Sequence, residues 1–69
     1  MSKNNQAKYH YLQALNLWPD YSSAYNNLGT LIDEYDISER YFLAAIHFSE
    51  FHLNAHYNLG QLYRFLSLF

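Results

Sequence analysis

The feature that most constrains this chain is an internal repeat with a period of 31 residues. When the sequence is shifted by that period, residues coincide over most of its length: Leu12 with Leu43, Ala14 with Ala45, Ala24 with Ala55, Asn27–Gly29 with Asn58–Gly60, and Leu31 with Leu62. A period of about 20 to 50 residues is typical of stacked supersecondary units, because one such unit cannot bury its hydrophobic face alone. The repeat therefore predicts stacked, similar units.

Hydrophobic residues recur with a helical period inside each unit. Four stripes lie on single helix faces: they are Ala7-Tyr11-Ala14-Leu15-Trp18, Ala24-Leu28-Leu31-Tyr35, Tyr41-Phe42-Ala45-Phe48 and Ala55-Leu59-Leu62-Leu66-Phe69. With 51% hydrophobic and 20% aromatic residues, the chain has the composition of a folded domain and not of a disordered one. We expect an all-α domain of four amphipathic helices.

The expected organisation is a single domain, 1–69, in which short connections make neighbouring helices antiparallel. One helix spans 6–18, the central unit 22–50 contains two helices, and the last helix spans 54–69. Small residues at equivalent repeat positions predict close helix crossings: Ala14, Gly29, Ala45 and Gly60. A glycine inside a helix costs about 1 kcal/mol relative to alanine, so its use twice at one position indicates a packing role.

Residues that start or stop helices agree with these boundaries. Pro19 cannot continue the first helix, because it lacks an N–H group. Ser22 is expected to be the N-cap of the second helix, and Asp36 with Glu39 resembles a capping box for the third. Asn54 is the expected cap of the fourth helix.

Charge and composition argue against several classes of function. The net charge is -2 and the four basic residues are scattered, so we expect no nucleic-acid partner. The longest apolar run, Phe42–Ile46, is too short to span a bilayer, and 1–6 lacks a signal-peptide core, so no membrane insertion is expected and a cytoplasmic location is the default. Without cysteine, the fold must be held by packing alone.

No residue pattern points to catalysis, and we expect neither an enzyme nor a cofactor. The chain has no nucleophile paired with a base, no phosphate-binding glycine loop and no paired catalytic carboxylates. His52 and His56 have a spacing that suits zinc on a continuous helix, but a turn is expected between them. We therefore expect no metal site.

Several of these residues together resemble the tetratricopeptide repeat (TPR) family. The resemblance is carried by Ala7, Tyr11, Ala14-Leu15, Leu17, Pro19, Ala24-Tyr25 and Leu28-Gly29, and it covers roughly residues 6–65. The chain departs from the family in its period of 31 residues, since the family repeat has about 34. Glu50 and Ser38 stand where the family has proline and alanine.

The resemblance implies antiparallel helical hairpins stacked as a short TPR-like α-solenoid, with one full repeat between two halves. In proteins of this family, asparagines at the positions of Asn27 and Asn58 line a concave peptide-binding groove, where a carboxamide can both donate to and accept from a peptide backbone. The implied peptide-binding residues are Asn27, Asn58, Asn26, Tyr57, Gln61 and Arg64, with Ser23, Thr30, Asp33 and Asn54 beside them.

The expected function is a protein–protein interaction scaffold that binds a peptide or a helix. One alternative is the TPR portion of a larger protein, such as a protein O-glycosyltransferase. Another is a self-associating helical module, in which the apolar final helix pairs with a second copy to form a homo-oligomer. Four aromatic residues are expected to be the least buried of the aromatics, and aromatic residues are the usual anchors of protein interfaces: Tyr9, Tyr21, Tyr57 and Phe65.

Overall fold

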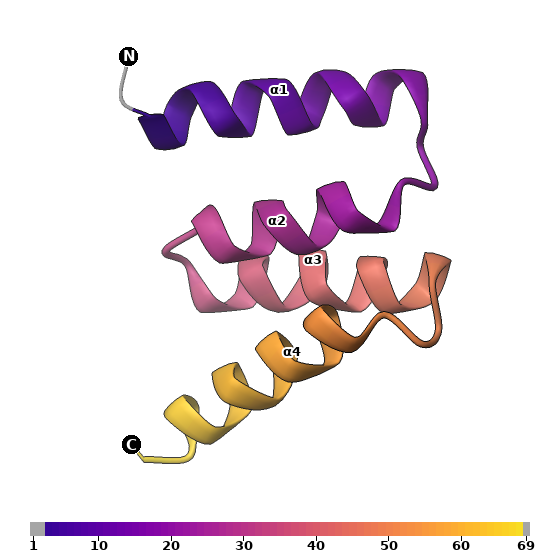
Figure 1. Cartoon of the computed structure of the whole chain (residues 1–69). Helices are drawn as coiled ribbons and strands as arrows, with labels where there is room; N and C mark the ends of the chain where they lie inside the picture. Colours follow the sequence, from indigo (N-terminus) through magenta and orange to yellow (C-terminus); the bar gives the residue numbers. More distant parts are fainter. Residues whose placement is uncertain (1–2, 69) are drawn as a thin grey trace.

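The computed structural model describes residues 3–68, which form four helices and no strand. The helices are α1 (Lys3–Leu17), α2 (Ser22–Leu31), α3 (Tyr35–Phe48) and α4 (Leu53–Leu66). Consecutive helices run in opposite directions, with α2 and α3 in the middle of the molecule and α1 and α4 on opposite sides of this pair (Figure 1). The Cα radius of gyration is 11.9 Å, close to the value of about 11 Å for a compact domain of this length. The expected all-helical class with four helices is confirmed.

The connection between α1 and α2 forms at the expected proline. The N–H of Trp18 still donates to the carbonyl of Ala14, at 2.8 Å, but Pro19 has no N–H to extend the helix. The Tyr25 hydroxyl donates to the carbonyl of Pro19 at 2.7 Å. This bond ties the connection to the first turn of α2, and it gives the tyrosine a structural role that the hydrophobic pattern does not reveal.

The starts of α2 and α3 differ from the expected caps. Tyr21 occupies the N-cap position of α2, and the Ser22 hydroxyl donates instead to the carbonyl of Ala45, at 2.7 Å, in the last turn of α3. Glu34 is at the N-cap position of α3, without a side-chain cap bond, so Asp36 lies inside the first turn. Its charge there favours the positive end of the helix dipole, but the predicted capping box is wrong.

The second helix is shorter than its hydrophobic stripe indicates. It ends at Leu31, because Ile32 adopts an extended backbone with φ -98° and ψ 131°. Tyr35, which the stripe assigns to the second helix, is the first residue of α3. Tyr35 is 47% exposed, so the stripe extends past the end of the helix without continuing into the core.

The core lies between α2 and α3, which form the most extensive helix contact in the described chain. Ala24 and Ala45 are 0% exposed, Leu28 is 1% exposed and Phe42 is 4% exposed. Burying a side chain such as that of Leu28 stabilises a fold by about 1.5–3 kcal/mol. Next to this core, the ring of Tyr25 stacks on that of Phe48 with centroids 5.5 Å apart.

Gly29 allows α2 and α3 to approach closely, as expected. A Cβ atom on Gly29 would lie 2.5 Å from Cε1 of Phe42, so any side chain there would force the ring to move. The Gly29 carbonyl accepts a 2.6 Å hydrogen bond from the buried Ser38 hydroxyl. This carbonyl belongs to the last turn of α2, whose carbonyls have no partner inside the helix, so Ser38 satisfies it.

The outer helices are less covered than the central pair. Within the described residues, α1 has no fully buried residue and α4 has one, Ala55. A Cβ atom on Gly60 would meet nothing within 4 Å. The expected helix crossing at Gly60 is therefore wrong, because none of the described residues packs against that side of α4. Phe69, the last residue of the fourth stripe, lies outside the described residues.

Candidate functional site

The candidate residues lie on α2 and α4, the two helices that the internal repeat makes equivalent. Both helices run in the same general direction, and they contact each other in their N-terminal halves (Figure 1). Positions three and four residues apart share a helix face, so Tyr57, Gln61 and Arg64 lie on one face of α4. We call the predicted residues together the α2–α4 face; they are Asn26, Asn27, Tyr57, Asn58, Gln61 and Arg64.

A hydrogen bond between two candidate side chains links the helices. Nδ2 of Asn58 donates to Oδ1 of Asn26 at 3.0 Å. Asn26 is only 5% exposed, so its amide is occupied within the fold and is not open to a ligand. Asn58 is half-buried, and its carboxamide oxygen is not used in this bond. The structure thus makes Asn26 a helix-linking residue and leaves Asn58 at the edge of the contact.

Asn27 is half-buried and takes no part in that bond. Its backbone carbonyl accepts a 2.7 Å bond from the hydroxyl of Thr30, which is exposed one turn further along. The repeat makes Asn27 equivalent to Asn58, but the hydrogen bond between the helices joins Asn58 to Asn26. The reason is geometric: Asn26 points into the contact with α4, and Asn27 lies at its rim.

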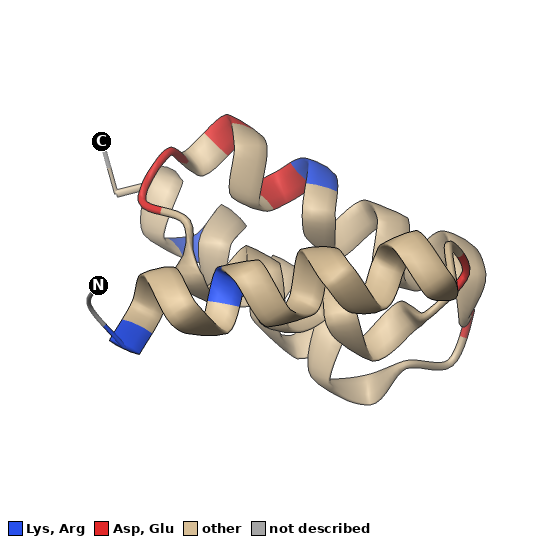
Figure 2. Cartoon of the chain, turned by 90° about the horizontal axis from the view of Figure 1, so that it is seen from above, with Lys and Arg blue, Asp and Glu red and all other residues tan. Residues whose placement is uncertain are grey.

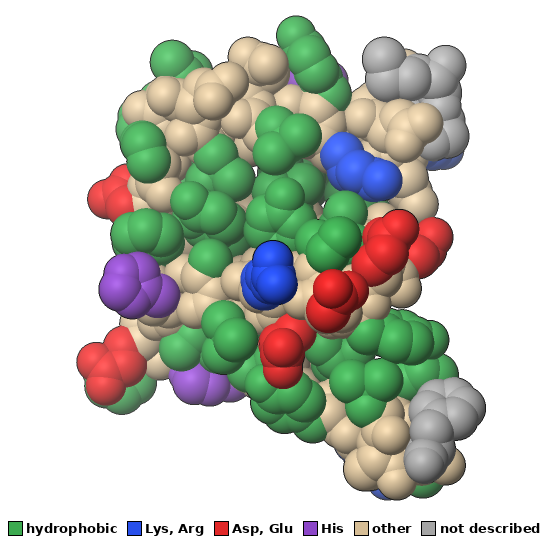
Figure 3. Space-filling model, turned by 180° about the vertical axis from the view of Figure 1, so that it is seen from behind, with side chains coloured by type: hydrophobic (Ala, Val, Ile, Leu, Met, Phe, Trp, Pro, Cys, Tyr) green, Lys and Arg blue, Asp and Glu red, His purple; other side chains and the backbone are tan. Residues whose placement is uncertain are grey.

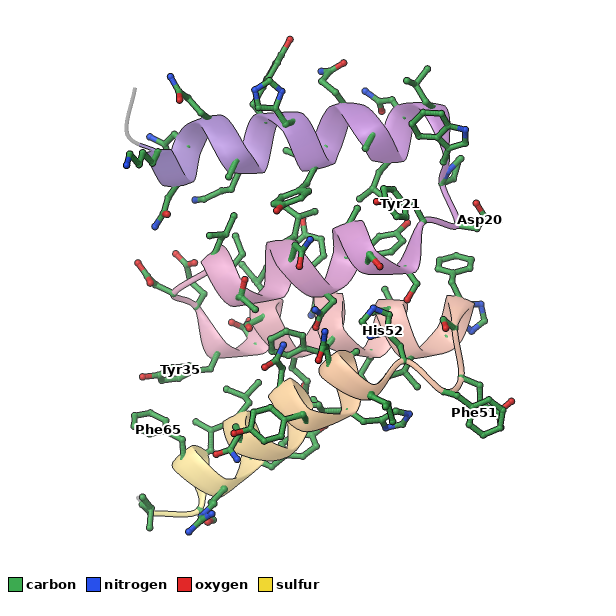
Figure 4. All side chains as sticks on the ribbon, viewed as in Figure 1. Asp20, Tyr21, Tyr35, Phe51, His52 and Phe65 are labelled. Carbon is green, nitrogen blue, oxygen red and sulfur yellow. The ribbon has the colours of Figure 1, made fainter. Side chains whose placement is uncertain are left out.

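His52 fixes the start of α4 and was not predicted to do so. Its Nδ1 accepts the N–H of Ala55 at 3.1 Å, so His52 and not Asn54 is the N-cap. Because Nδ1 is an acceptor, the neutral ring carries its proton on Nε2, which lies 3.4 Å from the Ser23 hydroxyl. Figure 4 shows His52 in the connection before α4, directed toward α2. The histidine thereby joins the N-terminal ends of the two equivalent helices.

The remaining predicted residues of the face are open to solvent. Tyr57 is 65% exposed, and Gln61 and Arg64 are exposed on successive turns of α4. Arg64 is the only charged residue of α4, and α2 has no charged residue. Figure 2 shows acidic residues at the α2–α3 turn, on α3 and at the opposite end of the molecule, and basic residues on α1 and α3. The face is therefore nearly neutral.

The two histidines that the sequence places four residues apart have separate partners. His52 caps α4, and Nε2 of His56 lies 2.7 Å from the carbonyl of Glu50. Among the described residues, no group of three or more histidine, cysteine, aspartate or glutamate side chains could hold a metal ion. These residues also enclose no pocket, so the α2–α4 face is an open surface.

One tyrosine on α4 has a perturbed acidity. Hydrogen bonding to Glu39 of α3 raises the pKa of the Tyr63 hydroxyl, and desolvation and the negative charge of the same carboxylate act in the same direction. All three effects disfavour the phenolate. The Tyr63 hydroxyl therefore acts as a neutral hydrogen-bond donor that connects α4 to α3, on a side of α4 different from the α2–α4 face.

Of the four aromatic residues predicted to be the least buried, Tyr57 is 65% exposed, but Tyr9, Tyr21 and Phe65, at 54%, 46% and 41%, are each less exposed than Trp18 at 58%. The prediction is therefore wrong for these three. Phe51 is more exposed than all of them, at 83%, and lies at the tip of the α3–α4 connection (Figure 4). The Phe65 ring contacts Tyr35 of α3 with centroids 5.4 Å apart. Phe65 is therefore partly engaged in the fold, whereas Tyr57 is the aromatic residue of the α2–α4 face.

Comparisons of the chain with protein-family models, with curated proteins and with solved structures find no match. None of the helices in the described part of the chain is long and apolar enough to cross a bilayer. The interpretation of the α2–α4 face thus depends on the chain's own repeat, packing and hydrogen bonds.

Proposed function

We propose that this chain is a TPR-like α-solenoid module that binds another polypeptide on the α2–α4 face. The repeat of 31 residues, the helical hairpin order and the close contact of Gly29 with Phe42 support this assignment. The observation that carries the proposal is the hydrogen bond from Asn58 to Asn26. It joins two repeat-equivalent helices, which together carry the amide side chains and the one aromatic side chain of the proposed binding surface.

The chemistry of this surface suits a neutral, extended peptide segment. Asn27, the free oxygen of Asn58 and Gln61 offer amide groups that can pair with a peptide backbone irrespective of its sequence. Tyr57 supplies a large aromatic contact at low cost in side-chain entropy. Lysines are absent from α2 and α4, so a ligand held by its terminal carboxylate is not favoured.

The test is to select extended peptides that bind the chain from a displayed random library and to measure their affinities by calorimetry. The double variant Asn27→Ala, Tyr57→Ala is expected to weaken binding by about tenfold or more, because it removes an amide partner and an aromatic anchor. Phe51→Ala, at a still more exposed aromatic outside the face, is the control and should bind as the parent does. Unchanged affinity in the double variant would exclude this face as the binding site.

A further inference from the structure

The internal repeat makes the contact between α2 and α3 a template for a second contact. At an offset of 31, α4 is the equivalent of α2, and α1 is the equivalent of α3. The chain therefore contains one complete α2–α3 pair and, at its two ends, the two halves of another such pair. Figure 1 shows α1 and α4 on opposite sides of the central helices, so these halves cannot meet within one chain.

Differences in burial between α3 and α1 show that α1 lacks one neighbouring helix. On α3, the residues that contact α2 include Ser38, Phe42 and Ala45, which are 5%, 4% and 0% exposed. Their equivalents on α1 are Ala7, Tyr11 and Ala14, all only half-buried. The paired residues are similar in size, so the lower burial on α1 reflects a missing neighbour and not a larger or smaller side chain.

Gly60 marks the side of α4 that lacks a neighbouring helix. In the central pair, the ring of Phe42 occupies the space that a Gly29 side chain would need. At Gly60 the same space is open, with nothing within 4 Å of a Cβ position. The equivalent of Phe42 is Tyr11, which is also aromatic but is only half-buried on α1, whereas Phe42 is 4% exposed on α3. The chain thus has an open space beside Gly60 and, at the matching repeat position on α1, an aromatic ring that is only half-buried.

We propose that copies of this chain associate head to tail, with α4 of one copy packed against α1 of the next as α2 packs against α3. In this arrangement Tyr11 of the second copy rests on Gly60 of the first. The contact joins two different surfaces, so it is heterologous and does not close at a dimer. Association continues the hairpin stack from one copy into the next. Figure 3 shows hydrophobic side chains over much of one side of the molecule. Stacking further copies would lengthen this hydrophobic surface.

The intermolecular contact is weaker than its template for two reasons. The hydrogen bonds from Ser38 to Gly29 and from Ser22 to Ala45 have no counterparts, because the equivalent residues are Ala7 and Leu53. The template helices are also joined by a short connection, which corresponds to an effective concentration in the millimolar range. Free copies lack this advantage, so the association depends strongly on protein concentration.

Charged residues near the end of the proposed contact test how α4 of one copy and α1 of the next are aligned. Asp33 and Glu34 adjoin in the α2–α3 turn, and their equivalents are Arg64 on α4 and Lys3 on α1. Head-to-tail docking therefore brings two positive side chains near each other. Lys3→Glu converts this repulsion into an attraction and is expected to tighten association by about two- to fivefold at low salt. Lys8→Glu, which makes the same charge change further along α1, is the matched control.

The main experiment is sedimentation equilibrium of the 69-residue chain over a concentration series from micromolar to millimolar. The weight-average mass is expected to rise past that of a dimer. Gly60→Ala should weaken association by about tenfold or more, because the new methyl group takes up the space that the Tyr11 ring of the next copy would fill. The same methyl group meets nothing in the monomer, so the variant should unfold at a higher temperature than the parent.

A constant monomer mass would overturn the proposal. A mass that levels off at a dimer would also overturn it, since a closed pair implies a symmetric contact of one surface with itself. An unchanged association in Gly60→Ala would place the contact elsewhere. These outcomes are independent of the proposed peptide binding, because the Asn27→Ala, Tyr57→Ala variant alters the α2–α4 face and leaves Gly60 and Tyr11 unchanged.

Discussion

At the scale of single residues, Gly29 and Gly60 occupy the same repeat position in opposite surroundings. Gly29→Ala is expected to destabilise the fold by about 1–3 kcal/mol, because the new Cβ would displace the buried Phe42 ring. Gly60→Ala is expected to stabilise it by up to about 1 kcal/mol, through helix propensity alone. Urea unfolding followed by circular dichroism at low protein concentration measures both. Changes of the same sign in the two variants would contradict this account.

Two serines test how much an unpaired helix carbonyl costs. Ser38→Ala leaves the Gly29 carbonyl without its donor and is expected to lower the free energy of unfolding by about 1–3 kcal/mol. Ser22→Ala is the matched control, because the Ala45 carbonyl keeps a bond from the N–H of Ser49. Its loss should be smaller, about 0.5–1.5 kcal/mol. An equal loss in the two variants, measured by urea unfolding, would refute the role given to the buried carbonyl.

The acidity of Tyr63 reports on the contact between α4 and α3. Glu39→Ala is expected to lower the Tyr63 pKa toward its ordinary value, because it removes both the hydrogen bond and the carboxylate charge. Since the folded-state pKa is raised, the contribution of this contact to stability is present at neutral pH and is lost as the pH rises through that folded-state value. Nuclear magnetic resonance (NMR) titration of ring-labelled tyrosine measures the change. Glu50→Ala is the control and should leave Tyr63 unaffected.

At the scale of helices, the α4 cap is a histidine where an asparagine was expected. His52→Ala should lower stability by about 1 kcal/mol and increase amide hydrogen exchange in the first turn of α4. His52→Asn can restore the bond to the Ala55 N–H but is too short to bring a donor to Ser23. The asparagine variant is therefore expected to recover the protection of α4. Equal exchange in both variants would show that the contact with Ser23, and not the cap, is the important one.

The sequence predicted helix interiors better than helix ends. Stripes such as Ala24-Leu28 follow from burial, which depends on the helical period and is visible in the pattern. The role of Ser22 was mispredicted because an exposed helix N-terminus and the carbonyl of Ala45 compete for the same hydroxyl, and only the packing of α3 decides between them. Within the candidate site, the same applies to Asn26, which the pattern could not distinguish from Asn27 as the buried partner of Asn58.

At the scale of the whole molecule, the described residues form one well-packed pair of helices with a partly covered helix on either side. Leu28 is the only large side chain among them with less than 2% exposure. A chain of this length buries about 60% of its unfolded surface, which leaves little stability in reserve. A neighbour that binds the folded form but not the unfolded chain raises stability by mass action.

The small core has a practical consequence for how this chain responds to heat. If each copy supplies the next one with a missing helix neighbour, dilution removes those neighbours. Each copy then depends on its own small core of Leu28, Phe42 and three alanines. The temperature of unfolding is then a property of the amount of protein in the tube as well as of its sequence.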